Sequence, residues 1–182
     1  MTRQLGQTEV KRLNRSWRHA TQARVCLLLD SVSQPFNVGS IIRSAAAFGV
    51  EHVWLCGDTA DPAHPAARKT ALGTSRLLSV SKAASAADTA EVVRSQGLRL
   101  VAVELADVAV PLHEASVGGD VCLALGNEAR GCSPGLLSVA DEIAYIPQIG
   151  RVGSLNVAAA AAIVLAEARR REWGDDRADR VP

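Results

Sequence analysis

A repeated alternation of short apolar runs with segments of helical spacing constrains the fold more than any other feature of this chain. We expect strands at residues 25–30, 52–57, 76–81, 98–105, 121–126 and 142–147. We expect helices at 38–49, 86–97, 133–140 and 154–172, and a broken helix or loop at 65–75. Buried strands that alternate with helices predict an α/β fold: a mostly parallel sheet with helices on both faces.

Size and composition predict one globular domain. The chain has 182 residues, of which 48% are hydrophobic and only 3% aromatic. This length suits a single core, which we place at 25–172, between a basic N-terminal arm or helix at 1–24 and a charged tail at 173–182. The scarcity of aromatic rings argues against recognition of nucleic acid by base stacking.

Positive charge is concentrated in the arm. Residues 1–24 hold six basic side chains and one acidic one, a net charge of +5, against −4 for the remainder. We expect Lys11, Arg12, Arg15 and Arg18 to bind phosphates. The alternative is a solvated leader segment with no binding role.

The four cysteines suggest no metal site. Cys26, Cys56, Cys122 and Cys132 form neither a CxxC pair nor a cluster with histidine at zinc spacing. We therefore expect reduced, buried thiols, no bound metal and a cytoplasmic protein. The N-terminus lacks the apolar stretch of a signal peptide. No apolar run is long enough to cross a membrane.

Three loops that follow predicted strands carry unusual polar residues, at the position where open α/β sheets bind ligands. In the first, Asn37 precedes a helix and is a candidate cap. Arg43 lies further along in that otherwise apolar helix. Such an arginine needs an anionic partner, unless its side chain simply extends to the surface.

In the second loop, Gly126 and Gly131 flank Asn127 and Glu128. Glycine at these points permits tight turns and close approach of the backbone to a ligand. Glu128 is placed to hold a ligand hydroxyl or ammonium, or to orient a side chain. The alternative is a glycine-rich turn with a surface glutamate.

In the third loop, Pro147 and two glycines precede Ser154 and Asn156. We expect Ser154 to cap the last helix, which leaves Asn156 without a structural explanation. The alanine run at 158–162 lets another backbone pack close, either within the domain or across a dimer interface.

In this order, the three stretches resemble the three motifs of the SpoU/TrmH-like branch of the SPOUT methyltransferases. The first resembles N-x-G-x-x-x-R, here Asn37, Gly39 and Arg43, and the second resembles G-x-E-x-x-G, here Gly126, Glu128 and Gly131. The third resembles I-P-x-x-G-x-x-x-S-L-N-V, here residues 146–157, with Gln148 where bacterial members commonly carry methionine. The likeness covers roughly residues 25–170.

The resemblance implies methylation of a ribose 2′-hydroxyl in RNA with S-adenosylmethionine as cofactor. It also implies a homodimer and a deep C-terminal trefoil knot, which no sequence pattern predicts because chains as a rule do not thread loops. The cofactor is implied to lie in the knot, held mainly by backbone groups. The implied cofactor-binding residues are Leu125, Gly126, Asn127, Ile146, Pro147, Gln148, Ser154, Leu155 and Asn156.

The resemblance also assigns the catalytic residues Arg43, Asn37, Glu128, Ser154 and Asn156. Arg43 is implied to help remove the hydroxyl proton, although arginine holds its own proton up to a pKa of about 12 or above. Either its environment favours the neutral form, or Arg43 anchors a phosphate and polarises the hydroxyl. The other four are implied to orient Arg43, the ribose and the cofactor, with Asn37 and Arg43 facing the cofactor of a partner subunit.

The expected RNA contacts are the four basic residues of the arm together with Arg169 and Arg170. A tRNA substrate of the D-loop guanosine type is favoured over ribosomal RNA, because the stretches at 69–75 and 146–157 resemble that subgroup. Two alternatives remain open. One is a methyltransferase for a small nucleoside or other non-RNA acceptor, and the other is a non-catalytic RNA-binding relic that keeps the fold.

Overall fold

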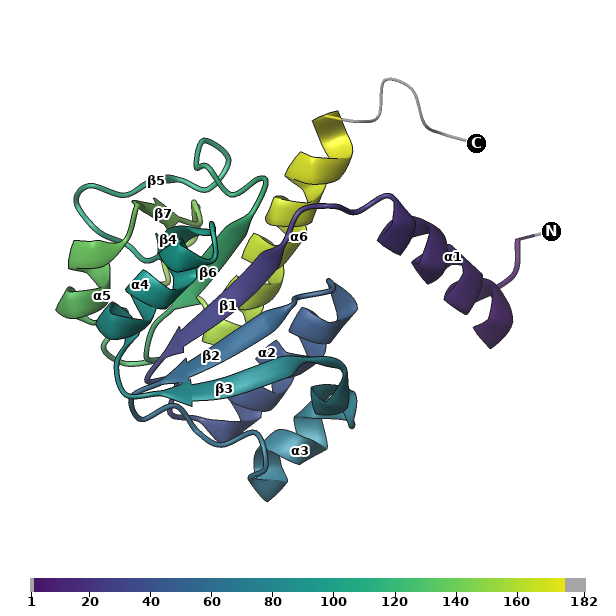
Figure 1. Cartoon of the computed structure of the whole chain (residues 1–182), viewed down its shortest axis with the longest axis horizontal. Coiled ribbons are helices and arrows are strands. Elements are labelled where there is room, and N and C mark those ends of the chain that lie inside the picture. The colour runs from purple at the N-terminus through teal and green to yellow at the C-terminus, as the bar shows by residue number, and fades with distance from the viewer. Residues whose placement is uncertain (1, 176–182) are drawn as a thin grey trace.

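A seven-stranded sheet organises the chain, whose computed structural model describes residues 2–175 (Figure 1). The strand order is β3-β2-β1-β6-β4-β7-β5, and each pair of neighbours is parallel. The strands are β1 (Val25–Asp30), β2 (His52–Cys56), β3 (Ser79–Ala83), β4 (Arg99–Val103), β5 (Val110–Pro111), β6 (Val121–Leu125) and β7 (Glu142–Tyr145). The prediction of a parallel α/β fold is confirmed.

Helices cover both faces of the sheet (Figure 1). They are α1 (Gln7–His19), α2 (Pro35–Ala47), α3 (Pro65–Ala71), the short 3-10 helix η1 (Thr74–Leu77), α4 (Ala86–Ser95), α5 (Pro134–Val139) and α6 (Val157–Asp175). Helices α2 and α6 share one core with the sheet, whereas α4 and α5 share a second core on the opposite face. Helix α1 stands away from the sheet and buries none of its residues (Figure 1).

Strand β1 explains why its sequence is uninterruptedly apolar up to Asp30. Successive side chains of a strand point to opposite faces. Leu27 and Leu29 therefore join the core of α2 and α6, while Cys26 and Leu28 join the core of α4 and α5. Because both faces are covered, every residue of β1 is buried.

The four cysteines are free and buried, as expected for reduced thiols. Burial raises the pKa of the Cys26 thiol to about 11, which leaves it protonated at neutral pH. Within residues 2–175, no helix is long and apolar enough to cross a membrane, and no group of side chains has the composition of a metal site.

Several element boundaries differ from the prediction: β3 lies at Ser79–Ala83 rather than 76–81, and the short strand β5 was not predicted. Two further differences bear on the site and on the tail. Helix α2 begins at Pro35, because proline is favoured at the first helical position, and Gln34 occupies the cap position. Asn37 therefore lies in the first turn of α2, and the prediction that it caps this helix is wrong. Helix α6 reaches Asp175, so the start of the predicted tail is helical, and its residues 176–182 lie outside the described part.

Gly39 lets helices α2 and α3 approach closely. A Cβ atom at Gly39 would lie 2.1 Å from both the Ala67 carbonyl oxygen and Thr70 Oγ1. No real Cβ atom tolerates such a distance to a backbone atom, so one helix would have to shift. The glycine of the first motif thus has a packing role.

We expect Gly39→Ala to lower the free energy of unfolding by about 1–3 kcal/mol, the usual effect of overpacking a filled interface. Gly153→Ala is the matched control, because a Cβ atom at Gly153 meets no atom within 4 Å. Urea denaturation followed by circular dichroism measures both variants. Equal stability of the two would contradict the packing role of Gly39.

Candidate functional site

The carboxylate of Glu128 joins the first two loops. Strands β1 and β6 are neighbours in the sheet, so the loops that follow them emerge side by side. Glu128 Oε1 accepts hydrogen bonds from the backbone N–H of Gln34 (3.0 Å) and from Asn37 Nδ2 (2.9 Å). Oε2 accepts from the backbone N–H of Ser33 (3.0 Å) and its hydroxyl (3.2 Å). Glu128 thus anchors the chain where α2 begins.

Asn156 attaches the third loop to the same group. Its Nδ2 donates to Asn37 Oδ1 (3.0 Å), so hydrogen bonds run from Asn156 through Asn37 to Glu128. Its Oδ1 accepts from the backbone N–H groups of Ala158 (2.9 Å) and Ala159 (3.3 Å). Asn156 is therefore the cap of α6, and the prediction that Ser154 plays this part is wrong.

The environment of Glu128 keeps its carboxylate charged. Partial burial alone would raise the pKa of Glu128, since desolvation disfavours the ionised form. The hydrogen bonds from Asn37 and from the backbone outweigh that penalty, and the net result is a pKa below the ordinary value. A negative charge beside the first turn of α2 also interacts favourably with the helix dipole.

The loop after β6 folds back on itself because of its glycines and Asn127. The side chain of Asn127 donates to the Ser31 carbonyl oxygen (2.7 Å) and accepts from the backbone N–H groups of Ala129 (3.0 Å) and Arg130 (3.1 Å). A Cβ atom at Gly126 would lie 2.2 Å from the backbone nitrogen of Cys132. The loop can close this tightly only with glycine at that position.

A cavity of about 370 Å³ lies beside this network. Its volume is within the range of small-molecule sites. Of the predicted cofactor-binding residues, those that line it are Leu125, Gly126, Asn127, Ile146, Gln148, Ser154 and Leu155. Two predicted residues, Pro147 and Asn156, are not part of its lining. The lining thus combines the second and third loops.

Sequence reasoning missed one wall of this cavity, at the end of β4. Val103, Glu104 and Leu105 line it. The Glu104 carboxylate is held by the backbone N–H groups of Cys132 (2.7 Å) and Leu105 (2.9 Å). The rule that ligands bind beyond the carboxyl ends of parallel strands applies to β4 as well, and would have pointed to Glu104. Tyr145, at the end of β7, was missed for the same reason.

Arg43 lies on α2 with an exposed side chain and is not among the residues that line the cavity of its own chain. Its two motif partners behave differently, because Asn37 and Gly39 are held in the packed part of α2. The predicted convergence of three distant segments is therefore observed for Asn37, Glu128 and Asn156, but not for the guanidinium of Arg43 within one chain.

Arg169 does not have the surface position that its predicted RNA contact requires. Its side chain is only 3% exposed and pairs with Glu172 at 2.9 Å. Its remaining donors bind the carbonyl oxygens of Ala23, Phe48 and Gly49. Arg170 is 62% exposed and pairs with Glu167 at 2.6 Å. Lys11, Arg12, Arg15 and Arg18 are exposed on α1.

The fold and the site together define a class: parallel α/β proteins that build a ligand cavity from loops at the carboxyl ends of neighbouring strands. Residues 24–166 match the sequence profile of the SpoU rRNA Methylase family. The chain belongs to the SpoU methylase family.

Relatives agree with this assignment. The chain is 35% identical over 162 residues to an uncharacterized tRNA/rRNA methyltransferase of Synechocystis, covering 88% of this chain and 59% of that protein. It is 33% identical to the tRNA (guanosine(18)-2′-O)-methyltransferase of Escherichia coli, covering 82% and 65%. The structure of the AdoMet-bound rRNA methyltransferase from Sinorhizobium meliloti superposes with a TM-score of 0.77 at 34% identity, covering 82% and 57%. The chain thus spans about 60% of the length of the relatives it matches.

The lowered pKa of Glu128 predicts a pH-dependent contribution to stability. A carboxylate whose folded pKa lies below its unfolded value stabilises the fold above the unfolded pKa, and this contribution disappears as pH falls through the folded pKa. At pH 7, Glu128→Gln should lower the free energy of unfolding by about 1 kcal/mol, a typical cost of losing a helix cap. The difference should shrink below pH 4.5. Denaturation from pH 7 to pH 3 measures it, with Glu91→Gln on α4 as the surface control; a difference independent of pH contradicts the charged role.

The cap assignment predicts different effects at the two polar positions of the third loop. Asn156→Ala removes the cap of α6 and should lower the free energy of unfolding by about 1 kcal/mol. Ser154→Ala should change it by less than about 0.5 kcal/mol. Asn156→Asp keeps an acceptor oxygen and should retain more stability than Asn156→Ala. Thermal and urea denaturation give the order, and equal effects at both positions would argue against the cap.

Proposed function

We propose that this chain carries an S-adenosylmethionine-dependent methyltransferase that acts on a ribose 2′-hydroxyl of RNA. The observation that carries the proposal is the network from Asn156 through Asn37 to Glu128 beside a cavity of cofactor size. Family membership supports the same activity. So do relatives named as RNA methyltransferases, one of them AdoMet-bound.

The cavity fits this cofactor chemically. Leu125, Ile146 and Leu155 offer apolar surface for the adenine base and for the carbon chain of the methionine part. The glycine loop contributes backbone groups to the lining. Gln148 Oε1 is buried without a hydrogen-bond partner among the described residues. Because Gln148 lines the cavity, this oxygen can accept a hydrogen bond from a ligand N–H. Glu104 adds a carboxylate that suits a cationic ligand.

When bound, the cofactor supplies a methyl group activated by a sulfonium. The residues of the chain have to align the hydroxyl oxygen with that methyl group, and positioning of this kind is worth about 7–11 kcal/mol. In this proposal Glu128, Asn37 and Asn156 hold the loops in place, and Ser154 lines the site. Arg43 assists loss of the hydroxyl proton, either as base or as the anchor of a substrate phosphate.

The proposal includes a homodimer, because Arg43 does not line the cavity of its own chain. In this proposal a second copy presents its cavity to the guanidinium on the exposed side of α2. Asn37 does not line the cavity either, but its bond to Glu128 attaches it to the wall of the cavity in its own chain. The proposal also includes a deep trefoil knot near the C-terminus. It further includes a location of the protein in the cytoplasm.

We propose RNA as substrate, with tRNA methylated at a D-loop guanosine favoured over ribosomal RNA. The Escherichia coli relative is named as a tRNA (guanosine(18)-2′-O)-methyltransferase, which supports a tRNA guanosine as target. Lys11, Arg12, Arg15 and Arg18 on α1 supply the phosphate contacts, and Arg170 adds to them. Arg169 is left out, because its side chain is buried.

Methyl transfer from labelled S-adenosylmethionine tests the proposal. The protein is incubated separately with tRNA, ribosomal RNA and free nucleosides, and ribose methylation is mapped by resistance to alkaline cleavage. Label in RNA supports the proposal. Label confined to nucleosides would indicate a small acceptor instead. RNA binding without transfer would indicate a non-catalytic relic.

Arg43→Ala should lower the transfer rate by at least about 100-fold, within the range for removal of a group that assists proton transfer. Cofactor affinity, measured by calorimetry, should stay within about twofold of the wild type because Arg43 is not part of the cavity wall. Glu91→Ala on α4 serves as the control for both measurements. Loss of cofactor binding in Arg43→Ala would refute this division of roles.

A further inference from the structure

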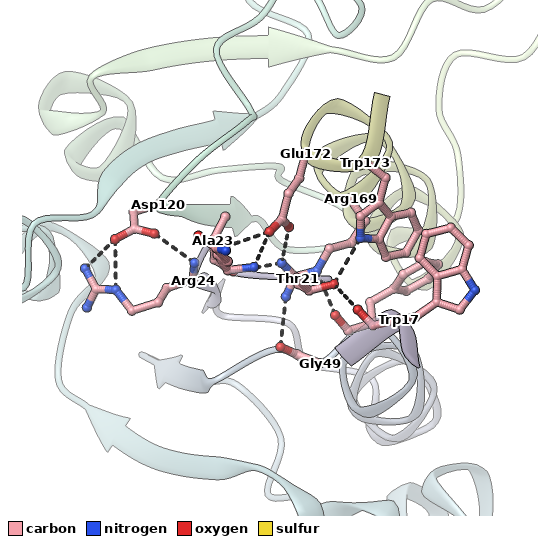
Figure 2. Close-up of polar contacts among 11 residues, drawn as sticks. Trp17, Thr21, Ala23, Arg24, Gly49, Asp120, Arg169, Glu172 and Trp173 are labelled. Atoms are coloured by element: carbon pink, nitrogen blue, oxygen red, sulfur yellow. Dashed lines mark hydrogen bonds and ion pairs between the residues drawn. The ribbon is translucent and has the colours of Figure 1, made fainter. Parts of the chain in front are cut away.

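The attachment of α1 to the rest of the chain is more elaborate than a solvated arm requires. Helix α1 buries no residue, and residues 20–24 alone connect it to β1 (Figure 1). Yet the end of α6 holds this connecting segment at several points, as Figure 2 shows. The first and last helices of the described chain are thus joined directly.

The contacts of the connecting segment are made to its backbone. Glu172 Oε1 accepts from the N–H groups of Gln22 and Ala23, the latter at 2.8 Å, and Arg169 Nη1 donates to the Ala23 carbonyl oxygen at 2.8 Å (Figure 2). At the end of the segment, Arg24 binds Asp120 through its backbone N–H (2.8 Å) and its side chain (2.9 Å). Bonds to backbone atoms fix the path of the chain whatever side chains it carries.

Arg169 and Glu172 are themselves held rigidly. Their side chains are 3% and 13% exposed, and they pair at 2.9 Å. The Arg169 guanidinium also donates to Phe48 O (2.9 Å) and Gly49 O (3.0 Å), where α2 ends. A buried ion pair whose donors all have acceptors holds its two side chains in one conformation. Removing one partner leaves the charge of the other buried and unpaired. Glu172 therefore cannot be lost without loosening the segment.

Two tryptophans extend the attachment into α1. The rings of Trp17 and Trp173 lie with centroids 4.8 Å apart at an interplanar angle of 46°. Trp173 Nε1 donates to Thr21 Oγ1 at 3.0 Å (Figure 2). A contact from within α1 sets the rotation of the helix about its own axis, which bonds to the connecting segment alone would leave free.

That rotation decides where the charges of α1 point. At 100° per residue, Lys11, Arg15 and Arg18 fall within a sector of about 60°, and Val10, Leu13 and Trp17 fall within a second sector whose centre lies about 140° away. Because Trp17 faces α6, the basic sector faces away from it. Among the described residues, none of these three basic side chains forms an ion pair. They remain available for phosphates.

We propose that Arg169, Glu172 and Trp173 form a mount that positions the basic side of α1 as a surface for the RNA backbone. The proposal rests on the proposed function, since it needs an RNA substrate. These three are positioning residues: they act on RNA affinity through the orientation of α1 and do not touch RNA. The mount also explains why Arg169 is buried, although it belongs to a run of three arginines (169–171) that the sequence alone would place on the surface.

The test compares Glu172→Ala with Asp141→Ala in the full chain. Asp141 is the matched control, because it also accepts from a backbone N–H (Leu100, 2.8 Å) and an arginine (Arg94, 3.0 Å), but has no contact with α1. Both changes remove one negative charge. The probe is an unmodified tRNA transcript, whose affinity is measured at several salt concentrations.

Glu172→Ala should weaken tRNA binding about tenfold or more. The slope of log affinity against log salt is negative, and its magnitude should fall by about 2–3, roughly 0.7–0.9 for each of three phosphate contacts. The exciton signal of the Trp17–Trp173 pair in circular dichroism should weaken, while S-adenosylmethionine affinity stays unchanged. Asp141→Ala should alter neither the slope nor the exciton signal.

A combined variant separates positioning from general loss of stability. If the mount acts through α1, adding Arg15→Gln and Arg18→Gln to Glu172→Ala should weaken binding little further, because the same contacts are already lost. Should Glu172→Ala fail to fold, Trp173→Phe removes the N–H donor to Thr21 and part of the ring contact with Trp17 while keeping one aromatic ring. It should reduce the magnitude of the slope by a smaller amount.

The two proposals fail in different ways. A wild-type protein that binds no tRNA and transfers no methyl group overturns both the proposed function and the mount. A wild-type protein that binds and methylates tRNA, together with Glu172→Ala and Trp173→Phe variants that match Asp141→Ala in affinity and slope, overturns the mount alone.

Discussion

The carboxylate of Glu128 is the interaction on which the site depends. It satisfies backbone N–H groups where the chain enters α2, which no residue within the helix can satisfy. Through Asn37 it also holds Asn156, and with it the start of α6. One charged group thus connects segments that follow β1, β6 and β7. The hydrogen bonds that lower its pKa keep it ionised at neutral pH, so the connection persists under ordinary conditions.

Much of the motif pattern serves this geometry rather than the reaction itself. Gly39 is needed because α3 lies too close to α2 for any side chain, and Gly126 because the loop after β6 returns onto its own backbone. Asn127 spends its polar atoms on Ser31 and on the turn that follows. The reacting groups can then be few, since a rigid surrounding structure keeps a cavity open at the carboxyl end of the sheet.

Charge alone does not reveal the role of an arginine. Arg43 lies in an apolar stretch and is exposed, whereas Arg169 lies in a run of three arginines and is buried. The difference arises from neighbours that are distant in sequence: Glu172 and three carbonyl oxygens surround Arg169. The buried Arg169 also holds the segment that connects α1 to β1, and the Trp17–Trp173 pair brings α1 itself against α6.

Local sequence patterns were enough to predict the parallel α/β fold, the burial of the cysteines and the three loops that form the site. Those features follow from local patterns: apolar runs of strand length, helical spacing, and glycines at strand ends. Three features became clear only from the folded chain: Asn156 rather than Ser154 caps α6, Glu104 lines the cavity, and Arg169 is buried. Each of these depends on which strands are neighbours and which helix ends meet. That pairing is set by the packing of the whole chain, and no local pattern records it.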